Sequence, residues 1–262
     1  TLVPLLAGGS VYMVEEDFGP LTPELILNTP QINALKLTPA HLSLLADSTS
    51  LATSSLELLV VGGAQLHVDL ANRVQQSLPS ARIINEYGPT ECTVGCTHHQ
   101  FDPHLDYPGT AVPIGQPGFN QRAHVTDSDG QPVPPGTPGE LWIAGLGLAR
   151  GYEGEKEETK SRFRSLPAQN EVRAYRTGDR VCFDRGGVLS FLGRVDRQLE
   201  IRGFRVEPAE VEASLERCRG VKEAAVTGLP HPNRRGGIVI GAWYVKGADT
   251  VSSDAILAQL SS

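Results

Sequence analysis

The stretch NEYGPTECTVGCTHHQ, residues 85–100, gathers five side chains of the types that bind metals: Glu91, Cys92, Cys96, His98 and His99. Structural zinc sites favour a closer pair of cysteines and a separate pair of histidines. Alternate residues of a strand share one face, so we expect the two cysteines to pack together and the histidines to end a solvated strand. A polar turn is therefore a better interpretation of this stretch than a zinc site.

The elements that would position this turn alternate between strand and helix. Strands are expected at 32–39, 56–64 and 81–88, and helices at 23–31, 39–47 and 67–78. This alternation predicts a parallel, doubly wound α/β sheet. Ligands of such sheets bind at the carboxyl ends of the strands, where both VVGGA and NEYGPTE fall.

The pattern of apolar and turn-forming residues changes twice further along the chain. From about residue 105, short β-type runs between Gly and Pro turns predict a small antiparallel unit with a hairpin at 183–193. A helix, two strands and a last helix follow. We expect three parts: the C-terminal part of a large α/β subdomain (1–104), a β-barrel-like subdomain (105–195) and a small α+β domain (196–262).

Composition excludes several classes of protein. The formal net charge is −7, which disfavours a general nucleic-acid binder because phosphates require basic partners. No apolar run reaches the length of a membrane span, and the first residues lack the basic region of a secretion signal. Four irregularly spaced cysteines do not indicate a disulfide scaffold. We expect a cytoplasmic protein.

Four motifs in order resemble one family: NEYGPTE (85–91), GELWIAGLGLARGY (139–152), YRTGD (175–179) and GRVDRQLEIRGFRVEPAEVE (193–212). They resemble the adenylate-forming superfamily, and specifically the adenylation domains of nonribosomal peptide synthetases. The resemblance covers nearly the whole chain. Any one short motif alone would be weak, but four in the right order are specific.

The resemblance implies a two-step ligase. An amino acid attacks the α-phosphate of Mg-ATP, giving an aminoacyl adenylate and pyrophosphate. The acyl group then passes to the phosphopantetheine thiol of a peptidyl carrier protein domain, beside other synthetase modules. The family's C-terminal domain is mobile and rotates between the steps.

Roles for individual residues follow from the resemblance and agree with their chemistry. Glu91 supplies a hard oxygen ligand for Mg, and Thr90 can hydrogen-bond the α-phosphate, so these two are the expected catalytic residues. The glycines of VVGGA, Gly62 and Gly63, would let the backbone approach the nucleotide, or would simply form a strand-to-helix turn.

Four more residues are expected to bind the nucleotide. Asn85 can read the adenine edge, and Tyr87 gives a flat face on which adenine can stack. Asp179 is an acceptor for the ribose hydroxyls, and Arg194 is a donor near ribose and phosphate. The plainer alternative for the last two is an ordinary surface ion pair worth little.

Positions near the C-terminal domain also match the family. Asp196 resembles the hinge residue, and Gly203, Phe204 and Arg205 resemble the loop that meets the carrier's pantetheine arm. The phosphate loop, the Asp that holds the substrate amine and the C-terminal Lys are expected outside this chain. We therefore expect an internal fragment that is inactive alone, or at best a weak nucleotide binder.

Two residues depart from the family pattern. Glu200 stands where the family often has Lys, and Phe191 stands where it often has Tyr near the nucleotide.

The amino-acid pocket matches six positions: Lys36, Val60, Gly62, Glu86, Val94 and Gly95. A buried Lys beside a buried Glu is tolerable mainly as a pair. Together they offer one donor and one acceptor, which match a carboxamide, so we predict L-asparagine. Aspartate would bring a second negative charge near Glu86, and glutamine needs more room. The pair could instead be a scaffold salt bridge away from substrate.

Two rival functions stay open at this point. One is an acyl-CoA synthetase-like ligase, which the charged pocket disfavours because a fatty acyl tail is apolar. The other is a non-catalytic nucleotide-binding or interaction module that has kept the fold and lost the chemistry.

Overall fold

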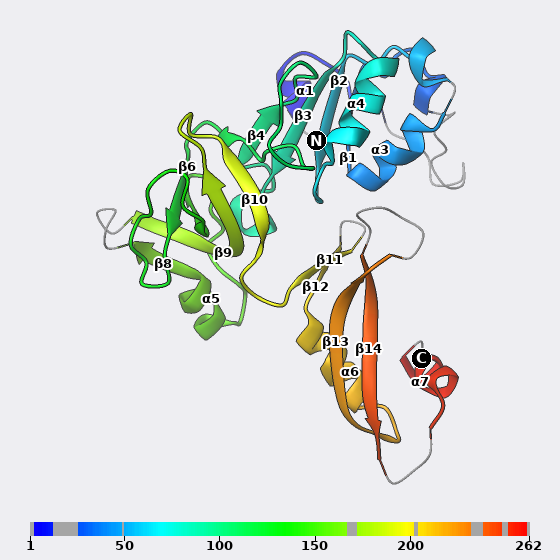
Figure 1. Ribbon diagram of the computed structural model, residues 1–262, viewed down its shortest axis with the longest axis vertical. Helices are drawn as coiled ribbons and strands as arrows, with labels where there is room; N and C mark the ends of the chain where they lie inside the picture. Colours follow the sequence, from blue (N-terminus) through cyan, green and yellow to red (C-terminus); the bar gives the residue numbers. More distant parts are fainter. Residues whose placement is uncertain are drawn as a thin grey trace.

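The computed structural model describes residues 3–12, 26–48, 50–166, 172–201, 204–231, 238–247 and 251–260. Its elements form an α/β part, an antiparallel β part and a C-terminal α+β part that follow one another along the chain (Figure 1). A short helix, α1 (Val3–Leu6), opens the chain. Among the described residues, no helix is long and apolar enough to cross a membrane.

The α/β part is built on a five-stranded sheet in the order β1-β2-β3-β4-β5. Its strands are β1 (Ala34–Leu37), β2 (Leu58–Gly62), β3 (Arg82–Tyr87), β4 (Thr97–Gln100) and β5 (Gln116–Pro117). The first three run parallel, as predicted, and the last two are antiparallel. The sheet thus reaches Pro117, beyond the boundary expected near residue 104.

Two helices, α3 (Pro39–Ala46) and α4 (Val68–Ser77), lie side by side against this sheet (Figure 1). Thr38 caps α3 by accepting from the backbone of His41, and Pro39 occupies the first turn, where its missing N–H costs nothing. The buried leucines of α3 share one core cluster with Leu59 and Ile83 of the sheet. The helix-covered face of the sheet is therefore the apolar one. A single 3-10 turn, Leu51–Thr53, lies between α3 and β2.

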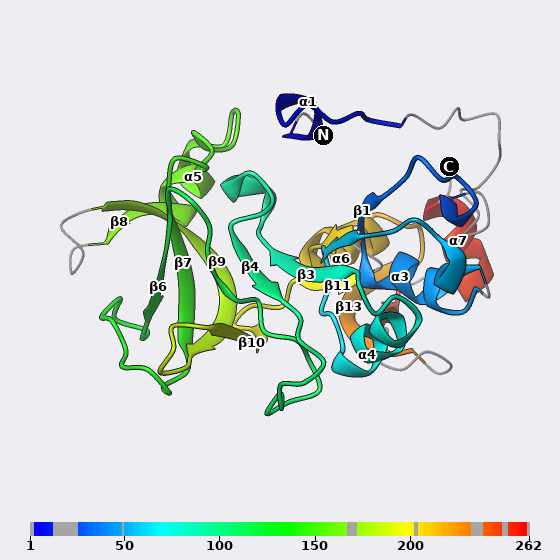
Figure 2. The same cartoon turned by 90° about the horizontal axis from the view of Figure 1, so that it is seen from above.

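The second part is an open antiparallel sheet rather than a closed barrel. Its strands pair in the order β10-β9-β7-β6, and β8 also pairs with β9. The elements are β6 (Gln121–Thr126), β7 (Gly139–Gly145), α5 (Lys156–Arg162), β8 (Phe163–Leu166), β9 (Val172–Phe183) and β10 (Leu189–Arg194). The predicted hairpin is confirmed, because β9 and β10 pair across 183–189. Figure 2 shows this sheet to one side of the α/β part.

The C-terminal part confirms the predicted order of a helix, two strands and a helix. It consists of β11 (Leu199–Ile201), β12 (Phe204–Val206), α6 (Pro208–Glu216), β13 (Val221–Pro230), β14 (Ile238–Lys246) and α7 (Ser253–Leu260). The strands form two antiparallel hairpins, β11-β12 and β13-β14. Buried Leu215, Val226 and Ile256 give this part a small core of its own.

Candidate active site

Glu91 lies in a 3-10 turn, Thr90–Cys92, that follows β3. Its side chain is only 9% exposed, and two groups donate to its carboxylate. The Tyr152 hydroxyl donates to Oε1 over 2.5 Å, and Nη1 of Arg205 lies 2.9 Å from both oxygens. The other guanidinium nitrogen of Arg205 donates to the Tyr175 hydroxyl over 3.3 Å. Residues from three parts of the chain thus meet at one carboxylate.

These partners keep Glu91 ionised. Burial by itself would raise the pKa of this carboxyl, but the Tyr152 hydrogen bond and the positive charge of Arg205 bring the pKa below its usual value. Burial and the hydrogen bond to Glu91 raise the pKa of Tyr152, so this hydroxyl stays a donor. The tyrosines end or begin two of the motifs noted in the sequence, yet their spacing gave no signal that they meet Glu91.

The backbone after Glu91 corrects one expectation. Thr93 and Val94 adopt left-handed conformations, with φ of 61° and 66°, so no strand runs from residue 92 to 96. The Thr93 hydroxyl donates to the Gly147 carbonyl over 2.6 Å, which fixes this bend. The alternation used to place Cys92 and Cys96 on one face is therefore wrong. Both thiols are nevertheless buried in the core of the second part, as predicted.

The five metal-type side chains of this stretch do not converge. Within the described ranges, no group of three or more His, Cys, Asp or Glu residues could hold a metal ion. His98 is exposed on β4, and His99 packs edge-on against Tyr107. Glu91 alone remains as an oxygen ligand, which suits a Mg²⁺ ion that takes its other oxygens from a nucleotide.

A second charged cluster lies at the end of β3 and around Arg194. Tyr87 donates to Oδ2 of Asp179, and Nη1 of Arg194 donates to Oδ1 over 2.7 Å. Arg194 also reaches Asp196 through Nε over 2.6 Å and Nη2 over 2.7 Å. The Asp179 and Arg194 side chains are 7% and 18% exposed, so this is not an ordinary surface pair. Burial raises the pKa of Asp179, and Arg194 opposes that shift.

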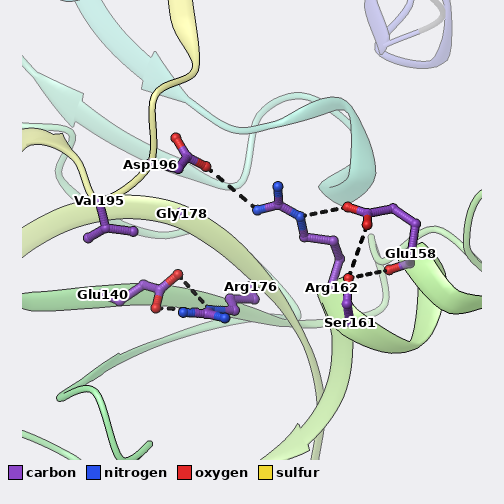
Figure 3. A pocket seen from close by; sticks show the side chains of 8 residues that line it. All are labelled: Glu140, Glu158, Ser161, Arg162, Arg176, Gly178, Val195 and Asp196. Carbon is purple, nitrogen blue, oxygen red and sulfur yellow. Dashed lines mark hydrogen bonds and ion pairs between the residues drawn. The ribbon is translucent and has the colours of Figure 1, made fainter. Parts of the chain in front are cut away.

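A polar cavity of about 330 Å³ adjoins the expected hinge (Figure 3). It is lined by Glu140, Glu158, Ser161, Arg162, Arg176, Gly178, Val195 and Asp196. Its charged side chains neutralise one another: Arg162 lies 2.9 Å from Glu158 and 3.7 Å from Asp196, and Arg176 lies 2.8 Å from Glu140. The Asp196 carboxylate therefore contacts the β part through α5 as well as through Arg194.

Asn85 and Tyr87 do not face outward as expected. Asn85 is 3% exposed, and its Nδ2 donates to the carbonyls of Val112 and Pro113 over 3.1 and 2.8 Å. This amide holds the segment before β5, which leaves its donors unavailable for an adenine edge. The hydroxyl of Tyr87 is held by Asp179, so only the ring of Tyr87 could meet a base.

Four of the six expected pocket residues lie on one face of the first sheet. Lys36 pairs with Val60 across β1 and β2, and Gly62 pairs with Glu86 across β2 and β3. Neighbours in register share a face, and so do residues two apart in a strand. This face is opposite to buried Val61, which packs in the core beneath the helices. The sequence prediction of a common pocket wall is geometrically consistent.

Lys36 donates to Glu86 on that face. Their side chains are 55% and 21% exposed, so the pair is less buried than expected. A Cβ built on Gly95 would lie 2.5 Å from the Glu86 carboxyl carbon, so only glycine leaves room for this side chain. Val94 is 51% exposed beside it. Gly62 similarly admits the backbone oxygen of Glu86, which a Cβ would meet at 2.7 Å.

Several other expected residues are placed more simply. Gly63 has φ of +81° and forms the turn after β2, as a glycine readily does. Thr90 is exposed at the start of its turn. Phe204 is 73% exposed on β12, while neighbouring Arg205 turns to Glu91 rather than outward. Gly203 lies outside the described residues.

The two departures from the family pattern are both placed. Phe191 packs against the core of the second part. Burial of the Glu200 carboxyl group and the negative charge of Asp179 raise the pKa of Glu200 to about 7.

Comparisons with known proteins agree on one family. Residues 1–153 match the model of the AMP-binding enzyme family. Bacitracin synthase 3 of Bacillus licheniformis is 37% identical over 96% of this chain, which covers 4% of that protein. The nonribosomal peptide synthetase protein PA1221, solved with adenylation and carrier domains bound to a vinylsulfonamide inhibitor, superposes with a TM-score of 0.81 at 30% identity. That match covers 93% of this chain and 42% of the PA1221 chain.

A third comparison concerns a solved complex with an aminoacyl nucleotide. The Vibrio cholerae adenylation domain AlmE, in complex with glycyl-adenosine-5'-phosphate, is 31% identical with a TM-score of 0.77. The match covers 90% of this chain and 45% of AlmE. The chain spans less than half of each of these proteins. The ligands named for them are ligands of those proteins. With more than half of its residues matched by the family model, the chain belongs to the AMP-binding enzyme family and is similar to nonribosomal peptide synthetase adenylation domains.

Proposed function

We propose that this chain is part of a domain that activates L-asparagine as an aminoacyl adenylate and passes it to a carrier-protein phosphopantetheine thiol. The observation that supports the substrate is the Lys36–Glu86 pair on the open face of the first sheet. The observation that supports the reaction class is the buried, ionised Glu91 in the motif that the family comparison covers. The protein would act in the cytoplasm, beside other synthetase modules.

The chain's own residues would bind and orient the reactants. Glu91 would hold Mg²⁺, which when bound with ATP neutralises phosphate charge. Thr90, exposed beside it, would donate to the α-phosphate. The Asp179 carboxylate would accept from ribose hydroxyls, with Arg194 holding it in place. In-line displacement at phosphorus needs this positioning and charge stabilisation more than covalent help.

The pocket pair discriminates by hydrogen bonding and charge. Lys36 would donate to the side-chain oxygen of asparagine, and Glu86 would accept from its amide nitrogen. A site built around such polar groups rejects analogues that leave them unpaired. Aspartate would place a carboxylate beside Glu86, so asparagine is favoured. A long apolar acyl chain would cover the Lys36–Glu86 pair and replace its water with hydrocarbon, which disfavours an acyl-CoA ligase.

The test is amino-acid-dependent pyrophosphate exchange by the domain with its native flanking sequence. We expect strong exchange with asparagine, weak exchange with aspartate, and loss of this preference in Glu86→Ala. Exchange with an unrelated amino acid would keep the reaction class and overturn the substrate. Exchange with fatty acids, or none with any carboxylic acid, would overturn the proposed function.

A further inference from the structure

Arg205 joins the C-terminal part to the carboxylate that is expected to bind metal. It lies on β12, whose hairpin partner β11 packs against β14 in the C-terminal part. From there its guanidinium reaches Glu91 in the first part and Tyr175 on β9 in the second. No sequence pattern predicted this contact, because residues 91 and 205 are far apart in the chain.

The contact occupies both oxygens of Glu91. Nη1 of Arg205 donates to Oε1 and Oε2 over 2.9 Å each, and Tyr152 adds a second donor at Oε1. A carboxylate at 9% exposure has little water to replace these partners. A Mg²⁺ ion needs a free oxygen lone pair at close range, and its charge repels a guanidinium held at the same carboxylate. The two cations therefore compete for Glu91.

We propose that Arg205 is a positioning residue that takes the place of Mg²⁺ on Glu91 and docks the C-terminal part when the metal is absent. Binding of Mg-nucleotide displaces Arg205 and releases this docking contact. With Mg²⁺ absent, Arg205 would keep Glu91 charge-balanced and hold the C-terminal part against the other two parts. The inference rests on the proposed function in one respect, the metal role of Glu91.

A neighbouring arginine provides the matched control. Arg197 belongs to the same part of the chain, and its Nη2 lies 2.6 Å from Glu212 and 2.9 Å from the Val226 carbonyl. Both partners are within the C-terminal part. Arg197→Met removes one positive charge and one ion pair from this part without touching Glu91, whereas Arg205→Met removes the charge that reaches it.

The experiment measures docking directly, in the domain with its native flanks. Fluorophores carried by non-natural amino acids at exposed Gln76 on α4 and Ala213 on α6 report the distance between the first and last parts. Mg²⁺ with a non-hydrolysable ATP analogue is then titrated. We expect fluorescence resonance energy transfer between the two labels to fall in the wild type and in Arg197→Met as Mg-nucleotide binds. Arg205→Met should show low transfer from the start and bind Mg-nucleotide about tenfold more tightly, a change of about 1.4 kcal/mol.

Two further variants or measurements show whether the Arg205–Glu91 contact docks the C-terminal part. Thermal unfolding of Arg205→Met checks that it is folded, and Arg205→Lys, which keeps the charge but cannot span Glu91 and Tyr175 together, should give intermediate transfer. Wild-type transfer and nucleotide affinity in Arg205→Met would overturn the inference while leaving the proposed function intact. Undocking in Arg205→Met, with no effect of Mg²⁺ on wild-type docking, would overturn the competition together with the metal role of Glu91.

Discussion

Replacing Glu86 by glutamine should change the choice between aspartate and asparagine more than it changes activity with asparagine. In the Glu86→Gln variant, the carbonyl oxygen of the new side chain can still accept from the asparagine amide. This neutral side chain no longer repels the carboxylate of aspartate. Lys36 remains in place as the donor to either substrate. The substitution therefore isolates one electrostatic effect at the pocket.

The size of this effect follows from Coulomb's law and from solvent exposure. Two like charges about 4 Å apart repel by about 4 kcal/mol at an effective dielectric of about 20 and by about 1 kcal/mol in water. The Glu86 side chain is 21% exposed and Lys36 is 55% exposed, so the environment lies between these limits. We take about 2 kcal/mol, which corresponds to a change of about 30-fold.

Pyrophosphate exchange with each amino acid gives the kcat/KM ratio of aspartate to asparagine. We expect Glu86→Gln to raise this ratio about 30-fold, chiefly through a gain with aspartate. Lys36→Met is the companion variant, and it should lower exchange with both substrates. A ratio that stays at the wild-type value in Glu86→Gln would refute the reasoning and would make the pair a scaffold salt bridge.

Three other predictions test the fold and the site. Asn85→Ala should lower the free energy of unfolding by about 2–4 kcal/mol, since it removes two buried hydrogen bonds, and urea titration would show this loss. The pKa of Glu200, raised to about 7 by burial and by Asp179, means that the folded state holds a proton that the unfolded state releases between about pH 4.5 and 7. Stability should therefore fall as pH rises through this window, by a small amount because Glu200 is buried only in part and solvent screens its carboxyl group, and Glu200→Gln should remove this dependence in unfolding curves at about pH 5 and about pH 8. Chelators and added zinc should leave the melting temperature unchanged, because Cys92 and Cys96 pack in a core; a metal-dependent shift would contradict this.

The order of the helices and strands was predictable because the spacing of apolar residues and the positions of Gly and Pro turns are local properties of the sequence. The alternating runs before residue 90 gave β1, α3, β2, α4 and β3 nearly as found, since each buries one apolar face. The sequence could not distinguish the open second sheet from a barrel, because short β-type segments between turns do not indicate whether the edge strands pair with each other. The bend at Thr93 was missed because left-handed backbone is unusual for residues such as threonine and valine.

The part of the site that was predictable lies in motifs that resemble the family. Lys36, Val60 and Glu86 were assigned to one pocket through the resemblance to the family, and the register of β1, β2 and β3 places them on one face of the sheet. The meeting of Tyr152, Arg205 and Glu91 could not be predicted, since it depends on how separate parts of the chain fold over one another. Asn85 was expected to read the adenine edge, and the structure shows that its amide nitrogen donates to the backbone carbonyls of Val112 and Pro113.

The register of the first sheet limits how this pocket can be redesigned. Its wall residues pair across two neighbouring ladders, Lys36 beside Val60 between β1 and β2, and Gly62 beside Glu86 between β2 and β3. Replacing one wall side chain leaves the strand register unchanged, so the other wall residues stay on the same face. Inserting or deleting one residue in β1 or β3 would turn the rest of that strand's side chains to the opposite face and bury Lys36 or Glu86 among the leucines. Substrate selectivity can therefore be changed by single substitutions of wall residues, but not by changing the length of the strands.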